Sequence, residues 1–153
     1  MSETVAYIDG GSHGNPGPAG IGVVIQHATG GRVEISECIG AHDNNYAEYA
    51  ALLAALRYAL GNGCLRLRVF SDSQVVVRQI NGHYNCQSPM LRQIYSVCVT
   101  LIESLEAFSL THVRREQNSE ANDLVRQAIA RAKAREKTRR AGQPSLSPAF
   151  AGD

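Results

Sequence analysis

Three acidic residues stand where folding could bring their carboxylates together. Asp9 follows the apolar residues of one predicted strand, Asp72 follows another, and Glu48 lies near the start of a predicted helix. Carboxylates that share a water-excluded site repel one another unless a cation lies between them. Oxygen ligands suit a hard ion such as Mg²⁺ or Mn²⁺, and no nearby set of cysteines and histidines indicates zinc. The three positions together therefore indicate a magnesium or manganese site.

Each acid also has a simpler explanation by itself. Asp9 precedes a glycine and could make a local turn bond, Asp72 could belong to a turn or a cap, and Glu48 is a first-turn helix acid. A metal site requires that the fold bring all three to one place. The elements around them decide between the two interpretations.

Residues 1–45 predict a three-stranded antiparallel meander. A strand over residues 4–8 is followed by the Gly- and Pro-rich connection 10–20, a second strand over 20–26, and a third over 32–39. The later residues alternate helices with two further strands. These elements are a helix from Tyr46 capped by Asn44 or Asn45, a strand over 65–70, a short helix from a Ser73 cap to Ile80, a helix from Pro89 to about 105, a strand over 107–113, and a final helix capped by Ser119 that runs to about 138.

This order predicts an α/β fold with a mixed five-stranded sheet covered by helices. Helices separate strands four and five from the strands before them, so both should lie parallel to strand one, while the first three strands are antiparallel. In such sheets, ligands gather beyond the carboxyl ends of the parallel strands. Asp9 and Asp72 should therefore meet at one edge of the sheet.

Composition predicts one domain over residues 1–130 with a basic extension over 131–153. The first part carries nine arginines, no lysine and twelve acidic residues, whereas the second carries six basic and two acidic residues. A strongly basic body, which would indicate general nucleic-acid binding, is absent. The extension is expected to continue the last helix, and residues 143–153 should be frayed.

The sequence also bears on the compartment. We find no apolar run long enough for a bilayer and no export segment, so we expect a cytoplasmic protein without a membrane partner. The four cysteines show neither C-x-x-C spacing nor a dense framework, so they should be reduced thiols. These are Cys38, Cys64, Cys86 and Cys98.

Four separated runs resemble type 1 ribonuclease H, in the family's order over residues 5–130. They are YIDGGSHGNPGPAGIGVVI, NNYAEYAALLAAL, FSDSQVVVRQI and HVRREQNSEANDLVRQA. The resemblance implies a ribonuclease H-like fold and a metal-dependent endonuclease that cuts the RNA strand of RNA–DNA hybrids, leaving 5′-phosphate and 3′-hydroxyl ends. It also implies two Mg²⁺ or Mn²⁺ ions, with Asp9, Glu48 and Asp72 as the first three members of a four-residue site.

The fourth member falls on Asn122 rather than on Asp123. In the family, an aspartate stands four residues after a recurrent asparagine, and four residues after Asn118 is Asn122. At about 100° per residue, Asn122 lies about 90° from the centre of the helix's apolar face and Asp123 about 170°. The expected site is therefore Asp-Glu-Asp-Asn, with Asp123 as the alternative. The apolar face is made by Ala121, Leu124, Val125, Ala128 and Ile129.

The resemblance also assigns roles to these residues. Asp9 should bridge both ions, Glu48 and Asp72 should hold the ion at the leaving group, and Asn122 should help to hold the ion that activates water. Because an amide lacks the negative charge, we expect a higher metal requirement. The residues expected to contact the minor groove of the hybrid are Gly10, Gly11, Ser12, Asn15, Asn44 and Gln74, although Asn15 also suits a turn and Asn44 a helix cap.

Two features common among ribonucleases H are missing. No basic, Trp-rich insertion lies between Ile80 and Pro89, and the loop 114–119 has no histidine that could assist product release, which leaves Glu116 or Glu120. The basic residues after 130 could replace part of the positive surface, or they could be a solvated helix end. We expect a monomer without a small-molecule cofactor.

Two other functions would also use a fold of this kind. A hybrid-binding module without cleavage is the alternative that the asparagine allows. A nucleotide-binding ATPase of the same superfamily would need a second domain and phosphate loops, which these 153 residues do not supply.

Overall fold

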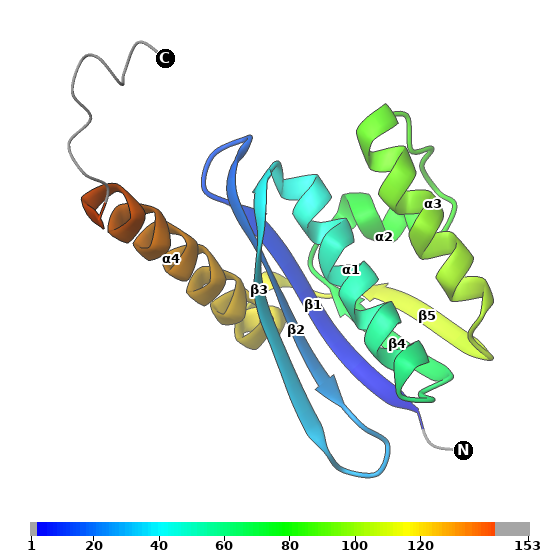
Figure 1. Ribbon diagram of the computed structural model, residues 1–153. Coiled ribbons are helices and arrows are strands. Elements are labelled where there is room, and N and C mark those ends of the chain that lie inside the picture. Colours follow the sequence, from blue (N-terminus) through cyan, green and yellow to red (C-terminus); the bar gives the residue numbers. More distant parts are fainter. Residues whose placement is uncertain (1–2, 143–153) are drawn as a thin grey trace.

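The computed structural model describes residues 3–142 and shows a five-stranded sheet between helices (Figure 1). The strand order is β3-β2-β1-β4-β5, with β2 antiparallel to both of its neighbours and β4 parallel to β1 and β5. The predicted fold class and strand directions are thus confirmed. The elements are β1 (Thr4–Ser12), β2 (Gly17–Gln26), β3 (Arg32–His42), α1 (Asn44–Gly61), β4 (Arg66–Ser71), α2 (Gln74–Ile80), α3 (Pro89–Glu103), β5 (Ala107–His112), the 3₁₀ helix η1 (Arg115–Asn118) and α4 (Ser119–Gly142).

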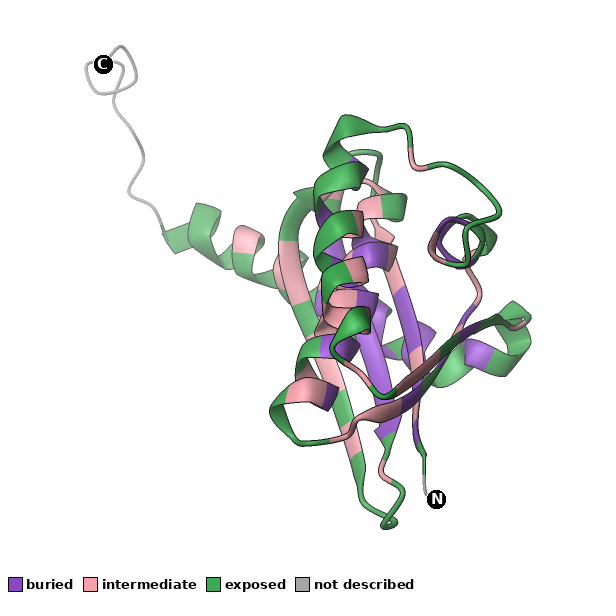
Figure 2. Cartoon of the chain, turned by 90° about the vertical axis from the view of Figure 1, so that its right-hand side faces the viewer, coloured by how far each residue is buried: buried purple, intermediate pink, exposed green. Residues whose placement is uncertain are grey.

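The helices form two layers, one on each face of the sheet. α1 packs on β1 and β2 and carries α3 on its outer side, whereas α4 packs on β1, β2 and β3 from the opposite face. β2 lies between both layers and is buried over residues 19–25. Figure 2 shows the buried residues along the central strands and the inner sides of the helices. Leu52 and Leu56 of α1 are fully buried, and each contributes about 1.5–3 kcal/mol through removal of its side chain from water.

The start of α1 differs from the prediction. The cap is Asp43, whose carboxylate accepts from the Tyr46 backbone N–H at 2.7 Å, and the helix begins at Asn44. The prediction of Asn44 or Asn45 as the cap is therefore wrong. The reason is that the side-chain oxygen of Asn44 is engaged elsewhere, because it accepts from the backbone N–H of Ser12 at 2.9 Å.

The first two strands are longer than predicted. β1 runs to Ser12, and its ladder with β2 includes Asp9 opposite Gly22, so Asp9 does not end the strand on that side. The parallel ladder between β1 and β4 does end there, at Ile8 opposite Ser71. Asp9 is thus the first β1 residue beyond the parallel pairing, because the antiparallel ladder continues through the glycines that the prediction had assigned to the connection.

The later helix boundaries are mostly as predicted. Ser73 and Ser88 cap α2 and α3, and Pro89 stands in the first turn of α3. Ser119 is not a cap, because η1 leads directly into α4 and makes Ser119 its first residue. α4 continues to Gly142, so the proposed domain boundary at residue 130 lies inside this helix and remains a prediction.

The cysteines and the hydropathy of the helices bear on further predictions. The four cysteines, all within the described part, are free. Among residues 3–142, no helix combines the length and apolar character that crossing a bilayer requires. The expected fraying of residues 143–153 lies outside the described residues.

Candidate active site

The carboxylates of Asp9, Glu48 and Asp72 converge at the edge where the parallel strands end. One oxygen from each lies within 4.8 Å of the others. Asp9 comes from β1, Asp72 directly follows β4, and Glu48 comes from the first turns of α1. Because Ile8 pairs with Ser71, the next residues of the two parallel strands are the two aspartates. Asp9 and Asp72 are thus neighbours at the ends of parallel strands, as predicted.

A glycine lets α1 approach this edge closely. Gly10 follows Asp9, and a Cβ atom built on it would lie 2.1 Å from the backbone oxygen of Ala47. No side chain fits at that distance, so only glycine allows α1 to lie here. The close approach also lets the Gly10 backbone N–H donate to Glu48 Oε1 at 2.7 Å, which fixes the Glu48 carboxylate beside Asp9.

A second glycine lets α4 pack equally closely on the sheet from the opposite face. Gly22 lies opposite Asp9 in the β1–β2 ladder, and a Cβ atom on it would lie 2.1 Å from the backbone oxygen of Ala121. The next residue of α4, Asn122, is 9% exposed and donates from Nδ2 to Asp9 Oδ2 at 2.8 Å. The structure therefore brings Asn122 to the acidic cluster.

Asp123 points away from the cluster. Its side chain is 61% exposed and lies 3.5 Å from the Arg126 guanidinium, one turn further along α4. This is the solvent-facing position that the helical geometry predicted. Of the two candidates for the fourth member, only Asn122 contacts another residue of the cluster.

Burial and mutual repulsion weaken the acidity of the cluster. Desolvation, together with the charge of Asp72, raises the pKa of Asp9 to about 6, although the Asn122 hydrogen bond acts in the opposite direction. Desolvation and the charges of Asp9 and Asp72 raise the pKa of Glu48 well above its ordinary value. The site thus holds more negative charge than its own hydrogen bonds compensate.

The cluster opens into a hollow of about 630 Å³ whose rim is largely polar and basic. Gly10, Gly11, Ser12 and Asn44 line one side, as the sequence led us to expect for substrate contacts. Of the opposite rim, the sequence had indicated only Glu116, as a candidate for assisting product release. This rim consists of His112, Arg114, Arg115, Glu116 and Arg126, together with the apolar Val125 and Ile129 of α4.

The parallel pairing of β4 and β5 places the residues that follow β5 on this rim. Ser71 pairs with His112, and the backbone N–H of Val113 donates to Ser71 O at 2.9 Å. The residues that follow β5 must therefore lie beside Asp72. Since β5 is the next parallel strand, these residues were predictable in the same way as the pair Asp9 and Asp72.

The polar loop beside the cluster is tied together by asparagine oxygens. Asn44 Oδ1 accepts from the Ser12 backbone N–H, and Asn15 Oδ1 accepts from the Asn44 backbone N–H at 3.0 Å. Both side chains are exposed, and their Nδ2 groups make no hydrogen bond within residues 3–142; Asn44 lines the hollow, whereas Asn15 does not. Gln74, at the start of α2, is exposed and does not line the hollow.

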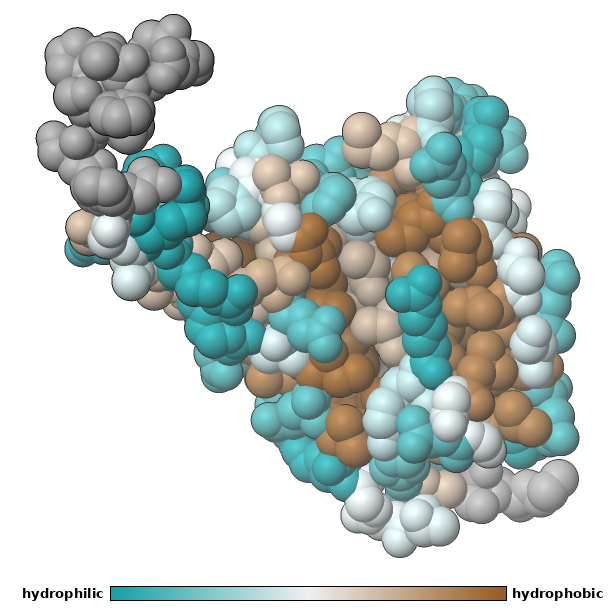
Figure 3. Space-filling view, in the orientation of Figure 1, coloured by the Kyte–Doolittle hydropathy of each residue, from teal (hydrophilic) through white to brown (hydrophobic). Residues whose placement is uncertain are grey.

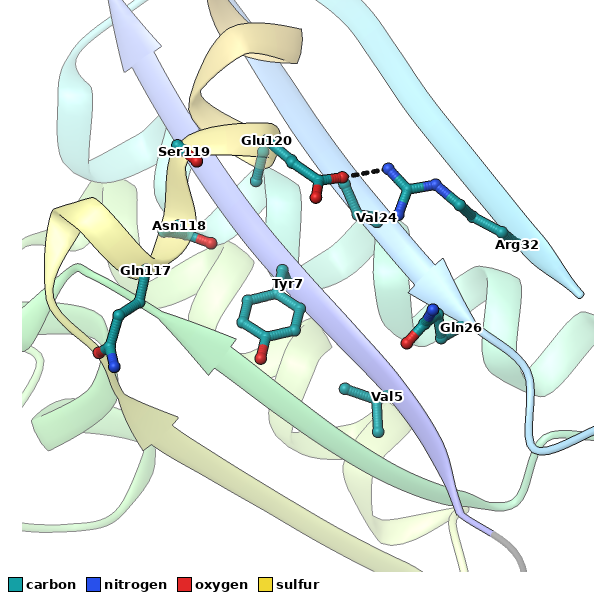
Figure 4. A pocket seen from close by; sticks show the side chains of 10 residues that line it. Val5, Tyr7, Val24, Gln26, Arg32, Gln117, Asn118, Ser119 and Glu120 are labelled. Atoms are coloured by element: carbon teal, nitrogen blue, oxygen red, sulfur yellow. Dashed lines mark hydrogen bonds and ion pairs between the residues drawn. The ribbon is translucent and has the colours of Figure 1, made fainter. Parts of the chain in front are cut away.

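A separate hollow of about 250 Å³ lies on the α4 face near Val5 and Tyr7 and shows how the start of α4 is fixed (Figure 4). Glu120 pairs there with Arg32, which also binds Glu34 at 2.8 Å. Asn118 donates from Nδ2 to Ile8 O at 2.8 Å. These contacts hold the first turn of α4 against the sheet, and they place Glu120 outside the acidic hollow, whereas Glu116 lines it.

Comparisons with known proteins match this fold and sequence over most of the chain. A family described as "Reverse transcriptase-like" matches residues 7–128. Ribonuclease HI of Halobacterium salinarum is 40% identical over 125 residues, which are 81% of this chain and 63% of that protein. The crystal structure of ribonuclease H1 from that archaeon gives a TM-score of 0.80 at 39% identity, over 84% of this chain and 98% of the solved one.

Two further solved structures are similar. A ribonuclease H1 isolated from compost, in complex with an RNA/DNA hybrid, gives a TM-score of 0.78 at 37% identity, over 85% of this chain and 99% of that one. The N-terminal ribonuclease H domain of Rv2228c from Mycobacterium tuberculosis gives 0.79 at 35% identity, over 83% and 98%. The chain spans 63% and 35% of the lengths of the archaeal and mycobacterial full-length relatives. From its sequence, its fold and the site that it assembles, the chain belongs to the type 1 ribonuclease H family.

Proposed function

We propose that this chain hydrolyses the RNA strand of RNA/DNA hybrids with the help of divalent cations, leaving 5′-phosphate and 3′-hydroxyl ends. The observation that carries the proposal is the convergence of Asp9, Glu48 and Asp72 within 4.8 Å at the base of an open hollow. The hybrid as substrate is supported by the compost ribonuclease H1, which was solved with such a hybrid bound.

The residues fit a hard divalent cation. Ribonucleases H are metal-dependent, and the acidic cluster of this chain offers oxygen donors only. The raised pKa values of Asp9 and Glu48 mark negative charge that lacks a partner inside the protein. We assign two Mg²⁺ or Mn²⁺ ions to the site, which when bound supply a hydroxide nucleophile and stabilise the leaving oxygen.

The protein groups position that chemistry. Asp9 lies between the other members and is the residue suited to bridge two cations. Glu48, held by the Gly10 N–H, and Asp72 would hold the cation at the leaving oxygen. Asn122 orients the Asp9 carboxylate through its amide N–H and would offer its amide oxygen to the cation on the water side. Because this fourth group is neutral, that cation should bind more weakly.

The polar side of the hollow is suited to the minor groove of a hybrid. Asn15 and Asn44 engage their oxygens within the protein, so their amide nitrogens can donate to 2′-hydroxyls and base acceptors. Gly10, Gly11 and Ser12 line the same hollow as Asn44 and the carboxylates. Gln74 would contact the hybrid only beyond this hollow.

One assay tests the proposal directly. Labelled RNA/DNA hybrid, DNA duplex and RNA duplex are incubated with the chain in Mg²⁺, Mn²⁺ or EDTA. We expect cutting of the RNA strand in the hybrid alone, and only with a metal. Asn122→Ala should lower the rate about 10- to 100-fold and Asp123→Ala less than about twofold, since only Asn122 contacts the cluster.

The neutral side chain of Asn122, in place of a fourth carboxylate, favours a second function. In this function the chain is a module that binds hybrids without cutting them. In that case the hybrid would bind, but no metal concentration would produce cleavage. A larger loss in Asp123→Ala than in Asn122→Ala would instead restore a site of four carboxylates. A cytoplasmic location, a monomeric state and the absence of a small-molecule cofactor remain predictions from the sequence.

A further inference from the structure

The outer half of α4, residues 130–142, packs no buried side chain against the rest of the protein. The buried residues of α4 all precede residue 129, and no residue from 130 to 142 is buried. Figure 2 shows this segment as exposed, and in Figure 3 hydrophilic side chains gather over it. Six basic residues and one acidic residue lie within it. Apolar burial therefore does not account for a helix in this place.

One face of this segment attaches the helix to β3. Arg131 donates from Nη2 to Ser36 O at 2.6 Å, and Arg135 Nη2 lies 3.8 Å from Cys38 Sγ. The two arginines are four residues apart and share a face. Their planar guanidinium groups thus act as structural contacts to the sheet.

A second face of α4 carries a row of basic side chains that leads outward from the active site. Arg126, Lys133, Lys137 and Arg140 all lie within about 60° of the direction of Asn122, at about 100° per residue. On the same count, Arg131 and Arg135 lie about 140–180° away. Arg126 lines the acidic hollow, and Lys133, Lys137 and Arg140 line a shallow surface beside Pro18 at the start of β2. We call these four residues the α4 stripe.

The face that contacts β3 carries arginines alone, whereas the stripe carries two arginines and two lysines. The chain has only two lysines, and both are in the stripe. An ammonium on a flexible stem suits a phosphate backbone of variable position, whereas arginine suits fixed contacts. One acidic residue, Glu136, lies on the same face, about 40° from the direction of Asn122, and pairs with Arg139 at 2.6 Å and with Arg140 at 3.1 Å. The stripe therefore presents positive charge, in a chain whose first 130 residues contain more acidic than basic groups.

We propose that the α4 stripe binds the phosphate backbone of the nucleic-acid duplex on one side of the cleaved bond. This inference rests on the proposed function for the identity of the duplex. From Asn122 to Arg140 the helix rises about 27 Å at 1.5 Å per residue. With about 3.4 Å per base step, the distance from Asn122 to the outer end of the stripe corresponds to about eight base pairs, of which the stripe itself covers about six. The contacts would be independent of sequence, because they reach phosphates rather than bases.

The experiment compares two matched double variants. Lys133→Gln/Lys137→Gln removes two stripe charges, and Arg131→Gln/Arg135→Gln removes two charges from the same stretch and at the same spacing, but off the stripe. Binding of a hybrid of about 16 base pairs, twice the length from Asn122 to the outer end of the stripe, is measured in EDTA over a range of salt concentrations. EDTA keeps the hybrid intact, so the result does not depend on whether the chain cleaves.

The stripe variant should lose about tenfold in affinity at about 0.1 M salt, and the slope of log K against log salt should fall by about 2. The off-stripe variant should lose less than about threefold and keep its slope. The loss should shrink on a hybrid of about six base pairs, which the hollow alone can hold. Circular dichroism checks that both variants keep their helix.

Three results would overturn the inference. Equal losses in the two variants would indicate general charge, and an unchanged slope in the stripe variant would show that no phosphates are bound there. Weaker binding to vesicles of phosphatidylserine and phosphatidylcholine, with unchanged hybrid binding, would assign the stripe to an anionic membrane. Failure of the chain to cut hybrids, with the slopes as expected, would remove the proposed function but leave the stripe as a duplex-binding surface.

Discussion

Two helices reach Asp9 from opposite faces of the sheet, and they bring it different chemistry. α1 approaches through Gly10 and contributes the charged Glu48, whereas α4 approaches through Gly22 and contributes the neutral Asn122. The charge of Asp9 raises the pKa of Glu48, while the Asn122 hydrogen bond lowers that of Asp9. The α1 side therefore supplies the charge that attracts cations. The α4 side supplies a hydrogen bond that holds the aspartate in place without adding to the repulsion.

The largest effect should come from Asp9, which both sides contact. Asp9→Asn keeps the size of the side chain but removes the charge that two cations would share, so hybrid cleavage should fall by about a thousandfold or more. Product formation under single-turnover conditions measures this, with Asp123→Asn as the matched control on α4. Residual activity above about a tenth of the unmodified rate would mean that the two sides do not act through Asp9.

Substitution of Gly10 and Gly22 tests whether α1 and α4 each need a glycine in order to pack closely on the sheet. Gly10→Ala and Gly22→Ala each place a Cβ 2.1 Å from a backbone oxygen, which cannot move without its helix, so each should cost about 3 kcal/mol of unfolding free energy. Gly61→Ala is the control, since nothing lies within 4 Å of its Cβ position. Urea unfolding gives the three values. If Gly22→Ala were as harmless as Gly61→Ala, α4 would not be tightly packed at Asp9.

The charge difference should also appear in the pH dependence of stability. The pKa of Asp9 is raised from 3.8 to about 6, so the folded chain binds this proton more tightly than the unfolded chain does. The stabilisation is complete below about pH 4 and is lost as pH rises through about 6, and Glu48 acts in the same direction. In EDTA, Asp9→Asn should therefore become more stable relative to the unmodified chain as pH rises from about 4 to about 7, by at most about 3 kcal/mol.

Urea unfolding of both chains at the two ends of this pH range measures the difference, and taking the difference cancels the carboxylates that do not interact with Asp9, whereas the smaller pKa shift of Glu48 in the variant changes the difference in the same direction. An Asp9→Asn variant that loses stability relative to the unmodified chain on this change would show that Asp9 is stabilised rather than strained by its neighbours. Added Mg²⁺ should reduce the difference, because a cation that binds the folded chain alone stabilises it.

The two sides also differ in how far the sequence could predict them. Asp9 and Asp72 were foreseeable, because they follow residues of adjacent parallel strands that pair in register. The roles of Gly10 and Gly22 were not, since a glycine in a strand does not reveal which helix will lie against it. The choice of Asp43 over Asn44 as the cap depended on Ser12, a partner 32 residues away that no local pattern contains.

The smallest expected effect tests the neutrality of the α4 side itself. Asn122→Asp restores a fourth carboxylate with almost no change in shape, so the cation beside it should bind more tightly. The Mg²⁺ concentration for half-maximal cleavage should fall about three- to tenfold, while without metal the added charge near Asp9 should lower the unfolding free energy by about 1 kcal/mol. Metal titrations of cleavage, and urea unfolding in EDTA, measure the two effects on the same preparation. Both changes should occur together, because the new carboxylate attracts the cation and also repels Asp9 where the Asn122 amide had donated a hydrogen bond. A lower metal requirement without loss of metal-free stability would show that Asn122 is not held against Asp9, and that the α4 side contributes geometry but no control of charge.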